Sequence, residues 1–342
     1  MPSGLSLADI DRGHQQKFGL NLLRAFAIVV VIFSHSIPLG FFDVRERSIV
    51  DILDCYDAVL FIMISGALLL PVTGSYGKFL GKRLTRVWIP FALWSIVYAL
   101  LNRYVLGTSE WWMWFQFKWF WVRPTFGAGW FVPAITAIYF FYPILSPWLR
   151  TASRSQIEYF LFLWFAAGAL SYLATIIGEI DYSLSLLATF YGMTGYAVAG
   201  FYFIRFPWSS MGVVRKILIP AICVVCGILL PFYYLRYNHK VDVQNLFWSN
   251  FSLHCMALGC LVFMLMSPVK SLGKPLNWLI NFVSRYSYGM YLTHMLVTKW
   301  VAREFFPEFS TSWLLFPLAV VVPLIFTWFI RQIPVVGKYI VG

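Results

Sequence analysis

The sequence has few charged residues for its length. Only 12% of its 342 residues are Asp, Glu, Lys or Arg, whereas soluble domains usually carry about 25%. Acidic residues are scarcest, at 14 against 26 basic ones. So little charge cannot cover the surface of a soluble domain of this length, and the composition therefore predicts a membrane protein.

Several catalytic and metal-binding motifs are also absent. The sequence contains no P-loop, no H-E-x-x-H, no G-x-S-x-G and no EF-hand loop, which argues against the classes of site that these motifs build. Five cysteines occur, all in or beside apolar stretches, and the C-x-x-C formed by Cys223 and Cys226 has no second ligand pair nearby. We interpret these cysteines as small apolar helix residues, and we predict no metal site.

Long apolar runs dominate what is present. Apolar residues make up 60% of the chain and aromatic residues 20%, and a spanning helix needs roughly 20 mostly apolar residues. The pattern predicts an all-α polytopic bundle, a single domain over residues 1–342, with about ten spans. We place them at 19–39, 49–71, 87–106, 130–149, 156–177, 184–204, 216–235, 246–267, 286–301 and 312–332.

The basic residues indicate the orientation of these spans. Most of the 26 Lys and Arg fall in the segments that are cytoplasmic if the N-terminus is, and most of the 14 acidic residues fall in the others. The positive-inside rule then predicts both termini in the cytoplasm, with residues 1–17 as a short cytoplasmic segment. Because the basic residues form no dense tract, the net charge of +12 predicts no nucleic-acid partner.

One predicted outer loop, between the third and fourth spans, is rich in tryptophan. It reads EWWMWFQFKWFWVRPTFGAGW. Tryptophan is typical of the headgroup level of a membrane, which favours an interfacial helix. The alternative is a stacking platform for sugar rings at the mouth of an active site.

Arg24 and His35 share one face of the first span. They are 11 positions apart, and eleven helical steps of about 100° bring the second side chain to within about 20° of the first, about 16 Å along the axis. Alone, Arg24 could be a snorkelling anchor and His35 a buried structural histidine. Together they suggest a polar stripe across the bilayer, where ionisable groups usually serve function.

Asp57, in the second predicted span, is a third ionisable candidate. At a depth similar to that of His35, its carboxylate could fix the tautomer of the imidazole, although it could equally pair with Arg24 or Arg103. Ser65 and Gly66 in the same span more simply predict close helix packing.

A basic cluster of Lys82, Arg83 and Arg86 precedes the third span. These residues could be positive-inside anchors. They could also bind the phosphates of a cytosolic donor such as a CoA thioester, because guanidinium groups match phosphate geometry.

The ninth span offers a second histidine. In SRYSYGMYLTHMLV, Tyr291 and His294 are three positions apart, as are Tyr288 and Tyr291, so they are helical neighbours. His294 is either an alternative base or a structural hydrogen bonder, and His254 in the eighth span is interpreted as structural.

Five segments, in order, carry a family resemblance. LRAFAIVVVIFSHS resembles the Arg-x10-His motif of the acyltransferase 3 family, and YDAVLFIMISGALLL resembles its acidic second helix. KRLTRVWIP, GWFVPAITAIYFFYPIL and SRYSYGMYLTHMLV are similar to three further helices of that family. Among the departures, Pro133 stands where the family usually has leucine.

The resemblance implies a membrane O-acyltransferase. Its donor would be acyl-CoA, with acetyl-CoA the first candidate, and its acceptor a glycan or glycolipid outside the bacterial inner membrane. It implies a catalytic role for His35 and Arg24, to which we add Asp57, with donor binding by Lys82, Arg83 and Arg86. Trp130, Tyr291 and His294 would then bind substrate, and membrane lipids are expected partners. A transporter or flippase of lipid-linked glycan is the alternative, although we find no inverted repeat.

Overall fold

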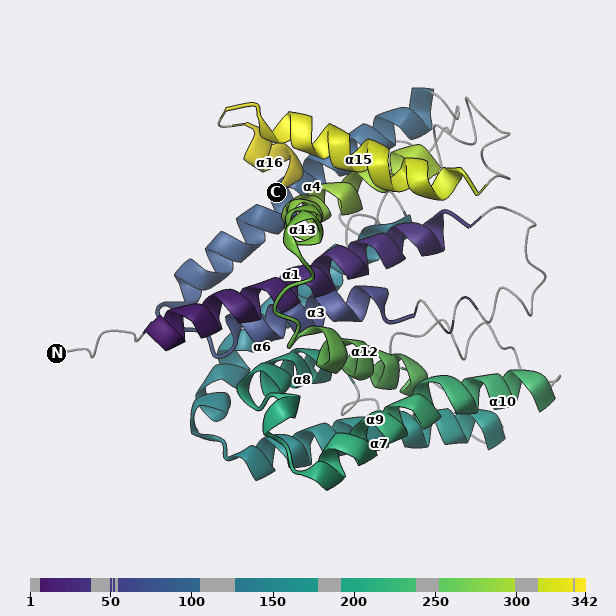
Figure 1. Cartoon of the computed structure of the whole chain (residues 1–342). Coiled ribbons are helices and arrows are strands. Elements are labelled where there is room, and N and C mark those ends of the chain that lie inside the picture. Colours follow the sequence, from purple (N-terminus) through teal and green to yellow (C-terminus); the bar gives the residue numbers. More distant parts are fainter. Residues whose placement is uncertain are drawn as a thin grey trace. The chain divides into compact units, whose positions relative to one another are not determined.

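Every regular element in the described part of the chain is a helix, which confirms the all-α prediction. The computed structural model describes residues 7–37, 50, 52, 55–104, 127–177, 192–237, 252–298, 313–334 and 336–342. In chain order (Figure 1), the elements are α1 (Leu7–His35), α3 (Asp57–Leu69), α4 (Tyr76–Tyr104), the 3-10 helix η2 (Gly127–Trp130), α6 (Phe131–Thr151), α7 (Arg154–Ile177), α8 (Thr194–Arg205), the 3-10 helix η5 (Trp208–Ser210), α9 (Val213–Val224), the π-helical turn η6 (Val225–Leu229), α10 (Leu230–Tyr237), α12 (Leu253–Met266), α13 (Lys274–Met295), α15 (Leu315–Arg331) and α16 (Gly337–Val341).

Four of these helical stretches are long and apolar enough to cross a membrane. They cover Lys17–His35, Tyr76–Tyr104, Ala128–Thr151 and Val213–Tyr233, and three shorter apolar helices cover Asp57–Leu69, Leu253–Met266 and Leu315–Arg331. Each predicted span overlaps a described helix. The total of ten spans and the cytoplasmic placement of both termini stay predictions, which reporter fusions after residues 75 and 210 (inside) and 240 (outside) would test.

Several helices differ from their predicted bounds, and α1 and α4 begin at Leu7 and Tyr76, ahead of the predicted starts at 19 and 87. The ninth span was placed at 286–301, but α13 already begins at Lys274. Its first turns carry Asn277 and Asn281, which lower the hydropathy of that stretch without preventing a helix. The second span was placed at 49–71, whereas α3 begins at Asp57, so this carboxylate lies in the first helical turn and not two turns inside.

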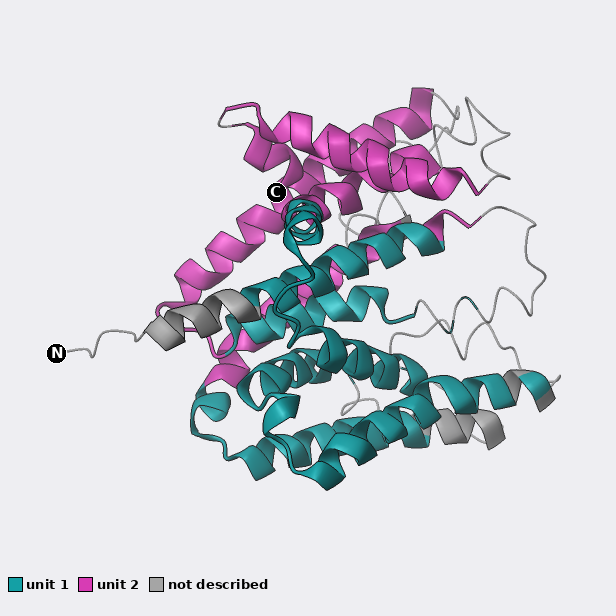
Figure 2. Cartoon of the chain, viewed as in Figure 1, with its two compact units in different colours: residues 1–34, 42–70, 147–284 teal, residues 35–41, 71–146, 285–342 magenta. Residues whose placement is uncertain are grey.

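The helices form two compact units built from interleaved segments of the chain (Figure 2). Unit 1 contains residues 1–34, 42–70 and 147–284, and unit 2 contains residues 35–41, 71–146 and 285–342. Helices α1, α6 and α13 contribute residues to both units. The prediction of one domain over the whole chain stays a prediction.

Close packing of α3 on α8 organises unit 1. A Cβ added at Gly66 would lie 2.0 Å from the carbonyl oxygen of Ala197, and one added at Gly200 would lie 2.0 Å from that of Met63. Only glycine permits two helix backbones to approach this closely. The interpretation of Gly66 as a packing residue is therefore confirmed.

A charged cluster ties together three further helices of unit 1. The Oε1 atom of Glu158 on α7 accepts hydrogen bonds from Arg154 Nε at 2.8 Å, Arg215 Nη1 at 2.7 Å and the Tyr202 hydroxyl at 2.6 Å. Arg215 lies on α9 and Tyr202 on α8. One carboxylate thus satisfies donors from three helices, an arrangement that supports the fold of this unit.

Unit 2 is linked differently, by aromatic side chains that donate to backbone or hydroxyl groups. Tyr98 on α4 donates to the carbonyl of Leu292 on α13 at 2.9 Å, and the Trp94 indole donates to the carbonyl of Ile340 at 2.9 Å. The Trp88 indole donates to Thr136 Oγ1 on α6, also at 2.9 Å. Rings that carry one polar atom can fill an apolar interior and still connect its helices.

Candidate active site

Two histidines from distant parts of the sequence meet in unit 2. His35 ends α1 and is exposed, whereas His294, near the end of α13, is fully buried. Their ring centroids lie 5.2 Å apart, and the rings meet edge to face at 62°. The sequence presented His35 and His294 as alternative bases, and the structure instead places them in contact.

The backbone of α13 fixes which nitrogen of His294 carries the proton. Nδ1 lies 2.7 Å from the carbonyl oxygen of Tyr291, and because a carbonyl can only accept, Nδ1 must be the donor. Nε2 is then the lone-pair nitrogen of the neutral ring. It is buried and has no hydrogen-bond partner among the described residues. His294 therefore offers a defined acceptor atom close to His35.

An aromatic series extends from the histidines to the start of α6. The Tyr291 ring lies 6.1 Å from His294 and 5.9 Å from Phe131, and Phe131 lies 6.1 Å from Trp130, all measured between centroids. Trp130 is half-buried at the end of η2. The structure thus brings Trp130, Tyr291 and His294, the predicted substrate-binding residues, into one continuous arrangement, in which Phe131 is a member that the motif analysis did not single out.

Arg24 lies within unit 1, in a polar cluster between α1 and the first half of α13. Its Nη1 atom donates to Asn21 Oδ1 and to Ser284 Oγ, each at 3.3 Å. The amide of Asn21 in turn donates to Asn281 Oδ1 at 2.8 Å. These two acceptors are uncharged, and they help to orient the guanidinium group. Asn21, Asn281 and Ser284 were not predicted, because short polar side chains alone carry no specific signal.

Asp57 occupies the first position of α3. Its Oδ1 atom accepts a hydrogen bond from the backbone amide of Ala58, and a carboxylate in the first turn interacts favourably with the helix dipole. Asp57 therefore lies at the N-terminal end of its helix. Its predicted partnership with His35 stays a prediction.

The predicted donor-binding cluster lies near the start of α4, in unit 2. Lys82 and Arg86 are exposed and Arg83 is half-buried, with its guanidinium carbon 5.9 Å from the centroid of the Phe79 ring. The Nε atom of Arg83 is buried and has no hydrogen-bond partner among the described residues. A buried cationic donor without an acceptor is unfavourable.

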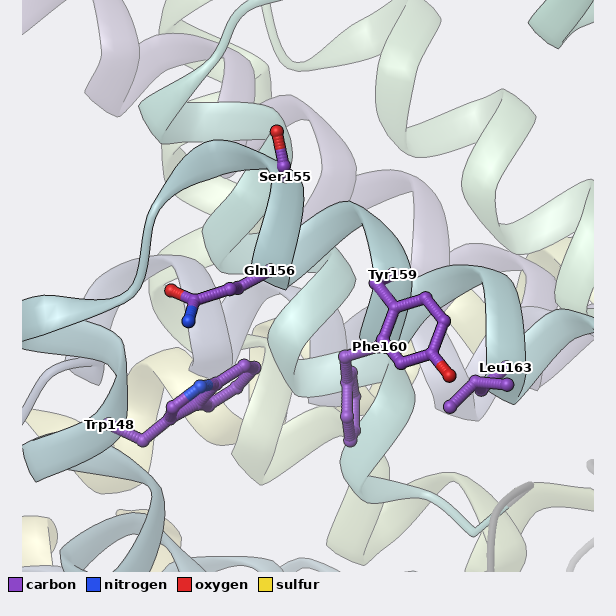
Figure 3. Close-up of a pocket in the computed structure, with 6 residues that line it drawn as sticks. All are labelled: Trp148, Ser155, Gln156, Tyr159, Phe160 and Leu163. Atoms are coloured by element: carbon purple, nitrogen blue, oxygen red, sulfur yellow. The ribbon is translucent and has the colours of Figure 1, made fainter.

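The remaining features carry no chemistry of this kind. A pocket of about 450 Å³ in unit 1 is lined by Trp148, Ser155, Gln156, Tyr159, Phe160 and Leu163, and includes none of the predicted site residues (Figure 3). His254 is fully buried, with Nε2 3.4 Å from Ser252 Oγ. Within the described ranges, no three His, Cys, Asp or Glu side chains are grouped so that they could hold a metal ion. The tryptophan-rich segment up to residue 126 lies outside the described residues.

Comparison with known proteins identifies the chain. Its all-helical architecture and long apolar helices are those of a membrane protein. A family model for acyltransferase 3, described as an acyltransferase domain, matches residues 17–332. The chain therefore belongs to the acyltransferase 3 family and is a membrane acyltransferase, which its five motifs had predicted. No curated protein and no solved structure matches it. Family membership favours an enzyme over the transporter or flippase interpretation.

Proposed function

We propose that this protein transfers an acyl group from acyl-CoA to a hydroxyl of an extracytoplasmic or lipid-linked glycan. Acetyl-CoA is the donor that we favour, and the bacterial inner membrane is the proposed location. The contact between His35 and His294 is the observation that supports this proposal best. Acyl transfer to a hydroxyl needs a base, and two imidazoles in contact can accept and pass on its proton.

The two histidines have different proposed roles. His35 is exposed and is therefore the ring that can reach a substrate. His294 is buried, and its lone-pair Nε2 atom can accept a hydrogen bond from the N–H of His35. The other nitrogen of His35 then carries the lone pair that removes the proton of the acceptor hydroxyl. This division follows the logic of a nucleophile and base that are oriented by a third group.

Arg83 and its neighbours are proposed to bind the donor. The orphaned Nε atom of Arg83 and the exposed side chains of Lys82 and Arg86 present positive charge to an anion. The phosphates of CoA have the charge and geometry that suit such groups. Arg24, held by Asn21 and Ser284, is proposed to stabilise negative charge that develops on the reacting carbonyl.

Trp130 and Tyr291 are proposed to form part of the acceptor site. Flat aromatic rings suit the apolar faces of a sugar, and Trp130 lies at one end of the aromatic series that reaches His294. This arrangement would place an acceptor hydroxyl on the side of the site where the histidines can remove its proton.

Mass spectrometry of surface glycans tests the function. Cells that make the protein should carry an O-acyl group on a glycan, and cells that lack it should lose this group. Membranes that contain the protein should also transfer label from acetyl-CoA to the glycan fraction. An unchanged glycan profile, together with a changed distribution of lipid-linked glycan across the membrane, would instead support a flippase.

A further inference from the structure

Tyr288 and Tyr291 lie three positions apart on α13, and their rings stack with centroids 6.1 Å apart and an interplanar angle of 14°. Each hydroxyl donates to the backbone of a different helical element of unit 2. Tyr288 donates to the carbonyl of Val87 on α4 at 2.6 Å, and Tyr291 donates to the carbonyl of Ala128 in η2. We call these two residues the tyrosine pair.

The carbonyl that Tyr288 binds lies beside a place where proline interrupts helical hydrogen bonding. Pro90 lies inside α4, and because proline has no N–H, it leaves the carbonyl of Arg86 without its usual donor. Val87 is the immediate neighbour of Arg86. The carbonyl that Tyr291 binds belongs to η2, directly before α6, whose first turn contains Pro133. In a membrane, groups on adjacent helices compensate for such breaks.

The two tethered segments are also those that carry the proposed substrate contacts. Val87 follows Arg86 directly, and Ala128 precedes Trp130 by two residues in η2. The same stretch of α13 carries His294, one turn beyond Tyr291. Helix α13 therefore binds the segment of α4 at Val87 and the segment of η2 at Ala128, close to the buried His294.

We propose that Tyr288 and Tyr291 are positioning residues for acyl transfer. Tyr288 holds the proline-interrupted part of α4 so that Arg86 and Arg83 meet the donor. Tyr291 holds the start of α6 so that Trp130 aligns an acceptor with the histidines. This inference depends on the proposed function for its kinetic consequences, but the tethers themselves do not.

The matched control is Tyr98, which also joins α4 to α13 through a hydroxyl-to-carbonyl hydrogen bond, at 2.9 Å to Leu292. Tyr98 lies near the end of α4, away in sequence from both prolines and both substrate segments. Changing any of the three tyrosines to phenylalanine removes the hydroxyl that makes the tether and keeps the aromatic ring. The three variants should therefore lose similar amounts of thermal stability, and they differ in which segment is released.

Kinetics with labelled acetyl-CoA, in membranes that contain the cell's own glycans, separates the roles. Tyr288→Phe should raise the KM for acetyl-CoA roughly threefold to tenfold, the range that one lost hydrogen bond gives, with kcat little changed. Tyr291→Phe should lower kcat by a similar factor and leave the KM for acetyl-CoA unchanged. Tyr98→Phe should change neither. If all three variants give the same kinetic change, or none gives any, the tyrosines are structural and the proposal is overturned.

Amide hydrogen exchange tests the tethers without any assay of activity. Tyr288→Phe should speed exchange in the peptide covering residues 84–92, and Tyr291→Phe in that covering residues 127–135, while Tyr98→Phe should speed neither. Unchanged exchange in both peptides would overturn the proposal even if the kinetics differ. If the wild-type protein transfers no label from acetyl-CoA but the exchange pattern is as expected, the proposed function fails while the tethers stand.

Discussion

The charged cluster of unit 1 and the proposed site residues of unit 2 use their polar side chains in opposite ways. In unit 1, Glu158 accepts hydrogen bonds from two arginines and a tyrosine, so donors and acceptor satisfy one another. In unit 2, Arg83 Nε and His294 Nε2 are buried and have no partner among the described residues. A satisfied cluster supports a fold, whereas an unsatisfied buried group usually has another reason to be present. This contrast is one reason why we place the proposed proton transfer at the histidines of unit 2.

The largest expected effect is on His35. Changing His35 to Gln keeps a polar side chain but removes the proposed base, and general-base catalysis contributes about 10² to 10⁴-fold in rate. Acyl transfer should fall by that factor, while expression and acetyl-CoA binding are kept. The rate of the His294→Gln variant should fall less, because the amide oxygen of glutamine can still accept a hydrogen bond from His35. If His294→Gln is the more damaged variant, the two roles are exchanged, and if neither loses activity both histidines are structural.

The second effect should appear in donor binding. Replacing Arg83 and Arg86 with Ala removes two charged donors, and hydrogen bonds to charged groups contribute about 1.5–3 kcal/mol each. The KM for acetyl-CoA should rise at least tenfold, and the rise should be much smaller for a pantetheine thioester that lacks the nucleotide phosphates. Equal losses for the two donors would show that the variant is misfolded or lacks its membrane anchor.

Two glycine-to-alanine variants, one in each unit, should have opposite effects on thermal stability. Gly66→Ala in unit 1 places a Cβ 2.0 Å from the carbonyl of Ala197, so its melting temperature should fall by an amount corresponding to about 1–3 kcal/mol. Gly81→Ala in α4 meets nothing within 4 Å, so it should stabilise the helix by up to about 1 kcal/mol. Thermal unfolding in detergent measures both. A harmless Gly66→Ala would mean that α3 and α8 can separate at little cost.

The smallest effect should come from the charged cluster of unit 1. Glu158→Gln removes the charge that Arg154 and Arg215 share, but the Glu158 side chain is 29% exposed, so the loss should be only about 1 kcal/mol. Acyl transfer should stay at the wild-type rate, and added salt should narrow the difference in stability. A large loss of activity in this variant would contradict the interpretation that the charged cluster of unit 1 serves only the fold.

The sequence allowed the helices to be predicted because apolar runs require no knowledge of the rest of the fold. The predicted bounds were wrong where a helix continues through polar residues. The first turns of α13 show this, because Asn277 and Asn281 lie there on a regular helix. The sequence could also place Arg24 and His35 on one face of α1, because helical spacing is local. It could not show which residues that face would meet.

The contact between His35 and His294 illustrates this limit. The two residues lie near opposite ends of the sequence, and the spacing within each helix says nothing about which helices pack together. The same holds for the hydrogen bond from Tyr291 to Ala128. The Tyr-x-x-His spacing indicated a polar helix face, but only the fold supplies its partners. The start of α3 was mispredicted for a local reason, because this helix begins later than the apolar run does.

The π-helical turn η6 has a consequence for how the helix from Val213 to Tyr233 meets its surroundings. A π turn forms where one extra residue is inserted into an α-helix. The insertion rotates all later side chains about the helix axis. Here it sets Gly227 against Leu258, where an added Cβ would lie 2.9 Å from Leu258 Cγ, and leaves Leu229 and Leu230 both exposed. Deleting one residue from this turn would restore an ordinary helix but rotate its second half by about 100°. The inserted residue thus allows Gly227 to pack against α12 while Leu229 and Leu230, shortly after it, stay exposed.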